Sequence, residues 1–221
     1  VNVLLPLAMH PIYEYSSKTE EAYVLEAIAA VREICKHLPW SKYSHTLQTV
    51  LNNLGRYPVQ ERFLIALMCS IIDAFHFPVD AGESATGPNK VQGNGVWRSL
   101  KNRIIPKVES FLIKEKVDKT GSTVKSLRSS VTLALMKLFQ KLPLQIFEEK
   151  LPKLITVVCG ALKNKESNER DIAKDTLSKM AVSLDLKYLP LILSELSTSL
   201  NEGYKLHVRA AALHSILVAL P

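Results

Sequence analysis

Basic side chains concentrate in one stretch of the chain, between Gly87 and Arg128. Ten lysines and arginines lie there with three acids, so the stretch carries +7, which equals the net charge of the whole 221-residue chain. Localised positive charge of this kind binds phosphate groups or acidic protein segments. The candidate residues for contacts with RNA or an acidic partner are Lys90, Arg98, Lys101, Arg103, Lys107, Lys114, Lys116, Lys119, Lys125 and Arg128.

A second interpretation of this basic stretch stays open on the residues alone. The same composition fits a solvated helix face followed by a lysine-rich linker. No RNA-recognition motif, zinc knuckle or arginine–glycine tract accompanies the charges. The charge pattern therefore predicts an anionic partner without saying which one.

The histidines and acidic residues of this sequence do not form a recognisable catalytic or metal-binding motif. His207 and His214 are seven residues apart and can share a helix face, but no cysteine or carboxylate joins them at metal-ligand spacing. Asp73 and His76 lie one helical turn apart without a nucleophile in a recognisable motif. No Walker lysine or complete dinucleotide-binding glycine motif is present. We therefore expect no enzyme activity, no catalytic residue, no cofactor and no metal site.

Apolar residues at helical spacing predict the elements that carry these side chains. Within residues 170–217 the apolar positions recur in steps of three and four, first over 172–184 and then over 188–200. Gly203 is placed to end the second of these helices. A third helix then begins near Leu206.

The same pattern returns along the chain at a fixed distance. Shifted by 42 residues, Arg128 aligns with Arg170, Leu135 with Leu177, Leu138 with Met180, Leu142 with Leu184, Leu151 with Leu193, and Leu154 with Leu196. Shifted by 36 residues, Val208, Leu213 and Ile216 align with Ile172, Leu177 and Met180. Helix pairs recurring at 36 to 42 residues are typical of HEAT or armadillo repeats. The predicted fold is all-α, an α–α superhelix of this solenoid type.

The repeats predict how the chain is divided. Residues 1–77 read as N-terminal HEAT-like helices, and 78–95 as a flexible loop that holds four of the eight glycines. Residues 96–221 read as HEAT repeats: a helix over 96–113 kinked at Pro106, a charged link, helix pairs over 124–163 and 167–202, and a last helix over 205–220. Both ends lack a polar outer face, so we expect a fragment of a longer solenoid.

Arg170 and Asp171 stand at the start of a predicted repeat helix. In HEAT units such residues form hydrogen-bonded ladders between neighbouring repeats, so we assign this pair a structural role. The scattered cysteines Cys35, Cys69 and Cys159 fit buried thiols in a reducing compartment, and no apolar run is long enough for a membrane span. The composition therefore favours the nucleus or the cytoplasm.

A family resemblance rests on residues 150–217. The matching positions are Arg170, Asp171, Thr176, Leu177, Lys179, Tyr188, Glu195, Leu196, Leu200, Gly203, Tyr204, Leu206, His207, Val208 and His214. With the preceding helix pair LPKLITVVCGALKNKESNERDIA, they resemble the small-subunit processome component 20 family, large nucleolar HEAT-repeat proteins that accompany the U3 small nucleolar ribonucleoprotein. Asp185 and the run Arg209 to Ala212 depart from the family pattern, and helix packing tolerates both.

The resemblance implies a non-catalytic scaffold in the nucleus and nucleolus. Its implied partners are pre-ribosomal RNA, the U3 small nucleolar ribonucleoprotein and other ribosome assembly factors, with no membrane and no small-molecule substrate. It would support pre-rRNA processing and assembly of the small subunit, which contains 18S rRNA. The alternative is a purely protein-binding HEAT scaffold, such as a nuclear transport receptor or a phosphatase scaffold, because many functions use this fold.

Overall fold

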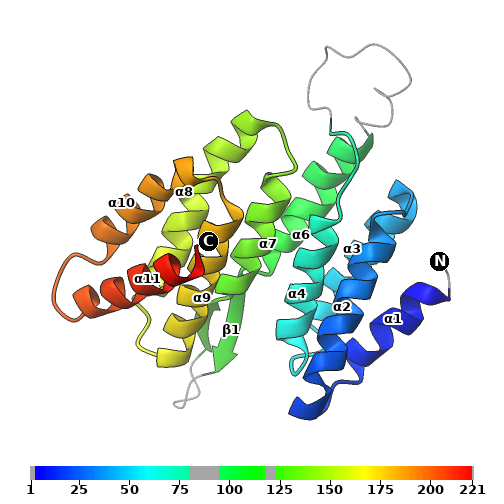
Figure 1. Ribbon diagram of the computed structural model, residues 1–221, viewed down its shortest axis with the longest axis horizontal. Coiled ribbons are helices and arrows are strands. Elements are labelled where there is room, and N and C mark those ends of the chain that lie inside the picture. Colours follow the sequence, from blue (N-terminus) through cyan, green and yellow to red (C-terminus); the bar gives the residue numbers. More distant parts are fainter. Residues whose placement is uncertain (1–2, 80–94, 118–122, 221) are drawn as a thin grey trace. The chain divides into compact units, whose positions relative to one another are not determined.

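Helices make up nearly all of the regular structure in the chain (Figure 1). A computed structural model describes residues 3–79, 95–117 and 123–220. They fall into two compact units, an N-terminal unit Val1–Val108 and a C-terminal unit Glu109–Pro221. Of the predicted glycine-rich loop 78–95, residues 80–94 lie outside the described residues.

Four α-helices and one short 3-10 helix form the first part of the N-terminal unit. They are α1 (Leu4–Tyr13), η1 (Lys18–Glu20), α2 (Glu21–Cys35), α3 (Trp40–Leu54) and α4 (Glu61–Asp73). Helix α2 packs against both α1 and α4, and α4 also packs against α3. On α3 the buried residues Tyr43, Leu47, Val50 and Leu54 recur at steps of three and four, so one amphipathic face explains the packing.

Aromatic rings and one buried hydrogen bond hold α3 and the end of α4 together. The Tyr43 hydroxyl donates a hydrogen bond of 2.6 Å to the backbone carbonyl of Ile71. The rings of Trp40 and Phe77 lie 5.9 and 5.1 Å from the Tyr43 ring, in stacked and edge-on arrangements. Such ring pairs add stability beyond the apolar area that they bury.

The helix that carries the first part of the basic stretch has an irregular centre. Residues 95–99 are α-helical, η2 (Leu100–Ile104) is a π-helix, and α6 (Ile105–Ser110) resumes the α-helix. The amide of Ile105 bonds to the carbonyl of Leu100, one residue further back than in an α-helix. Pro106 has no amide hydrogen and its ring crowds the carbonyl four residues back, which accounts for this widened turn. The predicted kink at Pro106 thus takes the form of a π-turn just before it.

A β-hairpin replaces the predicted charged link and the start of the predicted helix 124–142. Strands β1 (Ile113–Val117) and β2 (Thr123–Leu127) pair antiparallel, with Ile113 opposite Leu127 and Glu115 opposite Lys125. In β1, Ile113 and Val117 enclose three charged residues, and β-branched residues recur at Val117, Thr123 and Val124. The sequence prediction of helix from residue 124 was wrong here, because β-branched residues favour a strand and outweighed the apparent repeat.

The C-terminal unit continues as five α-helices. They are α7 (Ser129–Phe139), α8 (Leu144–Ala161), α9 (Ser167–Ser183), α10 (Leu189–Ser199), which follows the 3-10 helix η3 (Leu186–Tyr188), and α11 (Lys205–Ala219). Helix α9 packs against α7 on one side and α11 on the other, while α10 packs against α8. First helices of successive pairs therefore stack in one layer and second helices in another, as in a HEAT solenoid. The predicted all-α solenoid fold is confirmed.

Burial follows the 42-residue repeat in this unit. Leu135 and Leu177 are both fully buried, and the equivalent pair Leu138 and Met180 is also buried. Leu193 departs from the pattern with an exposure of 37%, whereas its equivalent Leu151 is buried. The sequence repeat therefore predicts the buried residues of α7 and α9 correctly, but it does not predict the exposure of Leu193 on α10.

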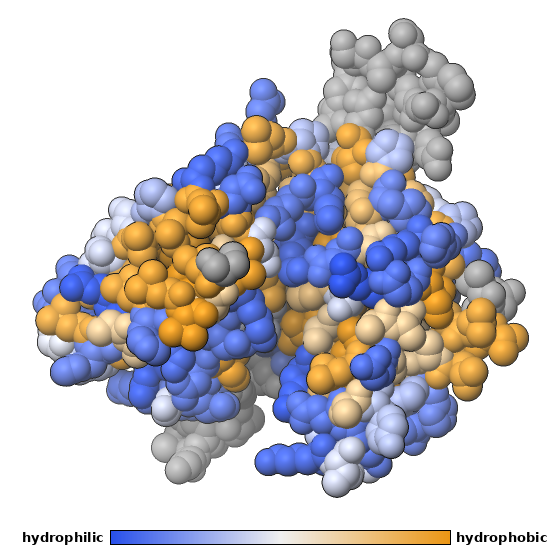
Figure 2. Space-filling model, viewed as in Figure 1, coloured by the Kyte–Doolittle hydropathy of each residue, from blue (hydrophilic) through white to orange (hydrophobic). Residues whose placement is uncertain are grey.

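Apolar surface remains on the last helices of the C-terminal unit. Leu206, Leu217 and Val218 of α11 are exposed, and apolar residues gather over this part of the surface in Figure 2. A capping repeat would present polar residues there. This face is typical of an interior repeat, in agreement with the predicted solenoid fragment.

Candidate nucleic-acid interface

The helical residues 95–110 carry four of the predicted basic residues. Arg98, Lys101, Arg103 and Lys107 are all exposed. The Lys101 ammonium lies 5.8 Å from the centre of the half-buried Trp97 ring, a cation–π distance. Exposed cations on a single helix supply the positive charge that attracts a nucleic-acid backbone.

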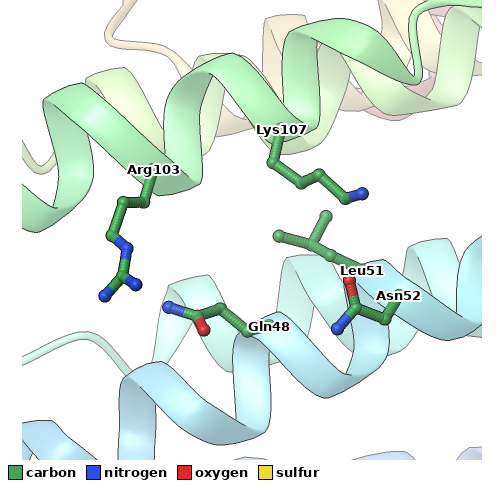
Figure 3. Close-up of a pocket in the computed structure, with 5 residues that line it drawn as sticks. All are labelled: Gln48, Leu51, Asn52, Arg103 and Lys107. Atoms are coloured by element: carbon green, nitrogen blue, oxygen red, sulfur yellow. The ribbon is translucent and has the colours of Figure 1, made fainter.

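Two of these cations face a different helix across a small cavity. Arg103 and Lys107 reach toward α3, where Gln48, Leu51 and Asn52 complete the lining (Figure 3). The cavity has a volume of about 190 Å³. The two amides were not predicted from the sequence, although their spacing of four residues places both on one face of α3.

The other predicted basic residues lie elsewhere. Lys90 and Lys119 are outside the described residues, and Lys114, Lys116 and Lys125 belong to the strands β1 and β2. The ten residues thus occupy several elements. Their joint role as one binding surface remains a prediction.

Arg128 is engaged in local structure. Its Nη1 donates a hydrogen bond of 3.3 Å to the carbonyl of Phe111, and its guanidinium lies 5.9 Å from the Phe111 ring. Its backbone amide donates to the carbonyl of Leu112 at 2.8 Å. These contacts fix the residue that precedes α7 against the segment that precedes β1.

Arg170 and Asp171 make local contacts that differ from the predicted ladder between repeats. Arg170 Nη1 donates to the carbonyls of Asn164 and Lys165 at 2.9 and 2.8 Å, which braces the turn before α9. Asp171 pairs with Lys174 on its own helix at 2.9 Å. The hydrogen bond from Lys174 lowers the pKa of the Asp171 carboxyl. These contacts stay within one repeat, and a ladder between repeats remains a prediction.

Other residues link the neighbouring repeats. Gln140, after α7, donates a hydrogen bond of 2.8 Å to the carbonyl of Ser183 at the end of α9. Ser178 of α9 donates to the Ser215 hydroxyl of α11 at 2.9 Å. The Tyr188 hydroxyl donates to the Glu148 carboxylate of α8 at 3.1 Å. Sequence analysis did not find these links, because single polar residues carry no periodic signal.

The described residues contain neither a group of side chains that could bind a metal ion nor a reactive thiol at Cys35 or Cys159. Within residues 3–79, 95–117 and 123–220, no three His, Cys, Asp or Glu side chains gather in a group that could hold a metal ion. Burial raises the pKa of the Cys35 thiol to about 11 and that of Cys159 to about 12, so both stay protonated at neutral pH. No helix in the same residues has the length and apolar character needed to cross a membrane.

Fold and surface together define a class, the HEAT-like α-solenoids, whose members bind macromolecules along stacked helices. A family model described as "U3 small nucleolar RNA-associated protein 20 domain" matches residues 118–221. Two relatives bear the name U3 small nucleolar RNA-associated protein 20. The one from Schizosaccharomyces pombe is 24% identical over 99% of this chain, and the one from Saccharomyces cerevisiae is 22% identical over 98%.

These comparisons confirm the family resemblance stated from residues 150–217, and extend it along nearly the whole chain. The chain spans 9% of the length of each of these two relatives. It is thus similar to one short section of proteins that are much longer.

Proposed function

We propose that this chain is part of a non-catalytic scaffold of the small-subunit processome. In that role it supports pre-rRNA processing and biogenesis of the small ribosomal subunit with its 18S rRNA, in the nucleolus of the nucleus. Its partners are pre-ribosomal RNA, the U3 small nucleolar ribonucleoprotein and other assembly factors. The observation that carries this proposal is the match of residues 118–221 to a family whose relatives are named for association with U3 small nucleolar RNA.

The structure supports a scaffold in two ways. Stacked helix pairs offer extended surfaces for macromolecules, and exposed cations on residues 95–110 suit a phosphate backbone. The cavities lined by Arg103 and by Tyr188 measure about 190 and 290 Å³. These two volumes lie at or below the lower end of the range of roughly 300–1,000 Å³ that holds small-molecule ligands. The scaffold that we propose acts on macromolecules and has no small-molecule substrate.

Purification of the protein that contains this chain from its own cells tests the proposal. RNA sequencing should recover U3 small nucleolar RNA and early pre-rRNA, and mass spectrometry should recover nucleolar assembly factors. Depletion should lower mature 18S rRNA relative to the large-subunit rRNA. Recovery of transport cargo or phosphatase subunits without RNA would instead support the purely protein-binding scaffold and refute this proposal.

A further inference from the structure

The cavity between α3 and the helical residues 95–110 has the composition of an anion site. Arg103 and Lys107 approach it from one side, and Gln48 and Asn52 face them from α3 (Figure 3). The side chain of the buried Leu51 lies between the two amides. Four polar side chains from two helices therefore converge on one small volume, and no carboxylate among the described residues lines it.

Three of these polar groups have no competing partner. Among the residues that the structure describes, Gln48, Asn52 and Arg103 make no hydrogen bond or ion pair with one another or with any other side chain. An arginine without a carboxylate partner keeps its N–H donors available to a ligand. The carboxamides add N–H donors without adding charge.

Local backbone geometry brings the cations into the cavity. Arg103 lies inside the π-helical turn and Lys107 in α6, with Pro106 between them. Four residues separate them, as they separate Gln48 from Asn52, so each pair lies along one face of its helix. Two parallel rows of donors thus oppose each other. The widened turn before Pro106 sets the rotation of Arg103 relative to Lys107.

We propose that Arg103, Lys107, Gln48 and Asn52 bind one phosphate group of an RNA backbone. A phosphate group presents acceptor oxygens in several directions, which suits donors arriving from two opposing helices. A carboxylate has its acceptor sites in one plane, which suits a single arginine fork better than donors arriving from two opposing helices. The volume of about 190 Å³ admits such a group. The inference rests on the proposed function and assigns RNA contact to specific residues.

Binding of a fluorescein-labelled oligouridine to the 221-residue chain, followed by fluorescence anisotropy over a range of salt concentrations, tests the proposal. The variant R103Q/K107Q should bind at least about tenfold more weakly, because charged hydrogen bonds to phosphate are lost. The slope of log affinity against log salt should fall by about 0.7, the value for one phosphate on a single strand. A fall of about 1.4 would mean two separate phosphates and would contradict a shared site.

Two matched variants separate the cavity from general charge. K18Q/R56Q removes the same two charges from exposed positions of the N-terminal unit and should change affinity by less than about twofold. Q48A/N52A keeps the net charge and should weaken binding about fivefold with an unchanged salt slope, because neutral hydrogen bonds are lost. Circular dichroism melting of each variant confirms that the fold is intact.

Each contrary outcome has a distinct meaning. Equal affinities of R103Q/K107Q and K18Q/R56Q would overturn the site, as would an unaffected Q48A/N52A. Competition by poly-glutamate as strong as that by unlabelled RNA would assign the cavity to an acidic protein. If the unaltered chain binds no oligouridine, this inference fails, whereas co-purification of U3 small nucleolar RNA with the complete protein would still uphold the proposed function.

Discussion

The two compact units use different means to hold helices together. In the C-terminal unit, equivalent apolar residues such as Leu135 and Leu177 recur and are buried in stacked helices. The N-terminal unit also buries apolar helix faces, but without a repeat along the chain, and adds individual long-range contacts such as the Tyr43 bond to Ile71 and the hydrogen bond of 3.0 Å from Asn53 to the Tyr13 hydroxyl. A repeat can therefore be detected in the sequence of the C-terminal unit, where equivalent apolar residues are buried in successive helix pairs.

Gln60 and Arg62 make further long-range contacts in the N-terminal unit that do not recur along the chain. Gln60 Nε2 donates to the carbonyls of Tyr13 and Tyr15, at 3.2 and 3.0 Å. Arg62 donates to the Tyr15 hydroxyl at 3.0 Å and pairs with Glu21 at 2.9 Å. Each contact joins positions more than forty residues apart, and none returns at another offset. The helices of the N-terminal unit resemble those of the C-terminal unit, but the hydrogen bonds of Gln60 and Arg62 have no equivalent at a repeat distance.

The largest effect expected from this comparison follows truncation of Leu177. Leu177→Ala should lower the free energy of unfolding by about 2–5 kcal/mol, because the side chain is fully buried on α9, which packs against three other helices. Urea unfolding followed by far-ultraviolet circular dichroism measures the loss.

Leu193→Ala is the matched control for Leu177→Ala. It removes the same atoms from α10 at a position that is 37% exposed, and should cost no more than about 1 kcal/mol. Equal losses in the two variants would show that stacking of α9 contributes no more than surface packing. Repeated burial in the α7 and α9 layer would then not explain the stability of the C-terminal unit.

A smaller effect is expected in the N-terminal unit from Tyr43→Phe. The change removes the buried hydrogen bond to Ile71 and keeps the ring contacts with Trp40. The Ile71 carbonyl retains the amide of Ala74 at 3.1 Å, so the loss should be about 1 kcal/mol. Tryptophan fluorescence during urea unfolding measures it, because both tryptophans, Trp40 and Trp97, lie in this unit.

Tyr23→Phe provides the control for Tyr43→Phe. Tyr23 is 72% exposed on α2, and loss of its hydroxyl should leave the unfolding midpoint unchanged. If Tyr43→Phe behaved like this control, the single buried hydrogen bond would contribute nothing to the N-terminal unit.

The sequence predicted the helix pairs of the C-terminal unit because their signal is spread over many residues. Leu135, Leu142, Leu177 and Leu184 are all buried between stacked helices, and the family resemblance covered residues 150–217 of this unit. The hairpin Ile113–Leu127 escaped notice because its short strands lay within a run of charge. The predicted helical periodicity was then extended over residues 124–127, which belong to β2.

The candidate site was only half predictable. Arg103 and Lys107 stood out as charges, but nothing in the sequence paired them with Gln48 and Asn52, which lie about fifty residues earlier on another helix. Polar residues on an amphipathic helix are ordinary solvent-facing positions. Their meaning depends on which helix faces them, and that is decided by tertiary packing.

The last expected effect concerns a property that the two units share. Cys35 on α2 and Cys159 on α8 are fully buried, one in each unit, and burial raises the pKa of their thiols to about 11 and about 12 from an ordinary value of 9.0. Since the folded chain holds these protons more tightly than the unfolded chain, their contribution to stability is complete below about pH 9. It is lost as pH rises toward the folded values.

The melting temperature should therefore fall as pH rises above 9, and the fall should be shallower in Cys159→Ala than in the unaltered chain. Lysines and tyrosines also titrate in this range, so the test is the difference in slope and not the absolute melting temperature. Cys35→Ala should reduce the slope of melting temperature against pH less than Cys159→Ala does. The reason is that the pKa of the Cys35 thiol rises only to about 11, so its contribution is lost over a narrower pH range. Identical slopes in all three chains would mean that water reaches both thiols. In that case neither the repeating core nor the individually linked core would exclude solvent as the structure indicates.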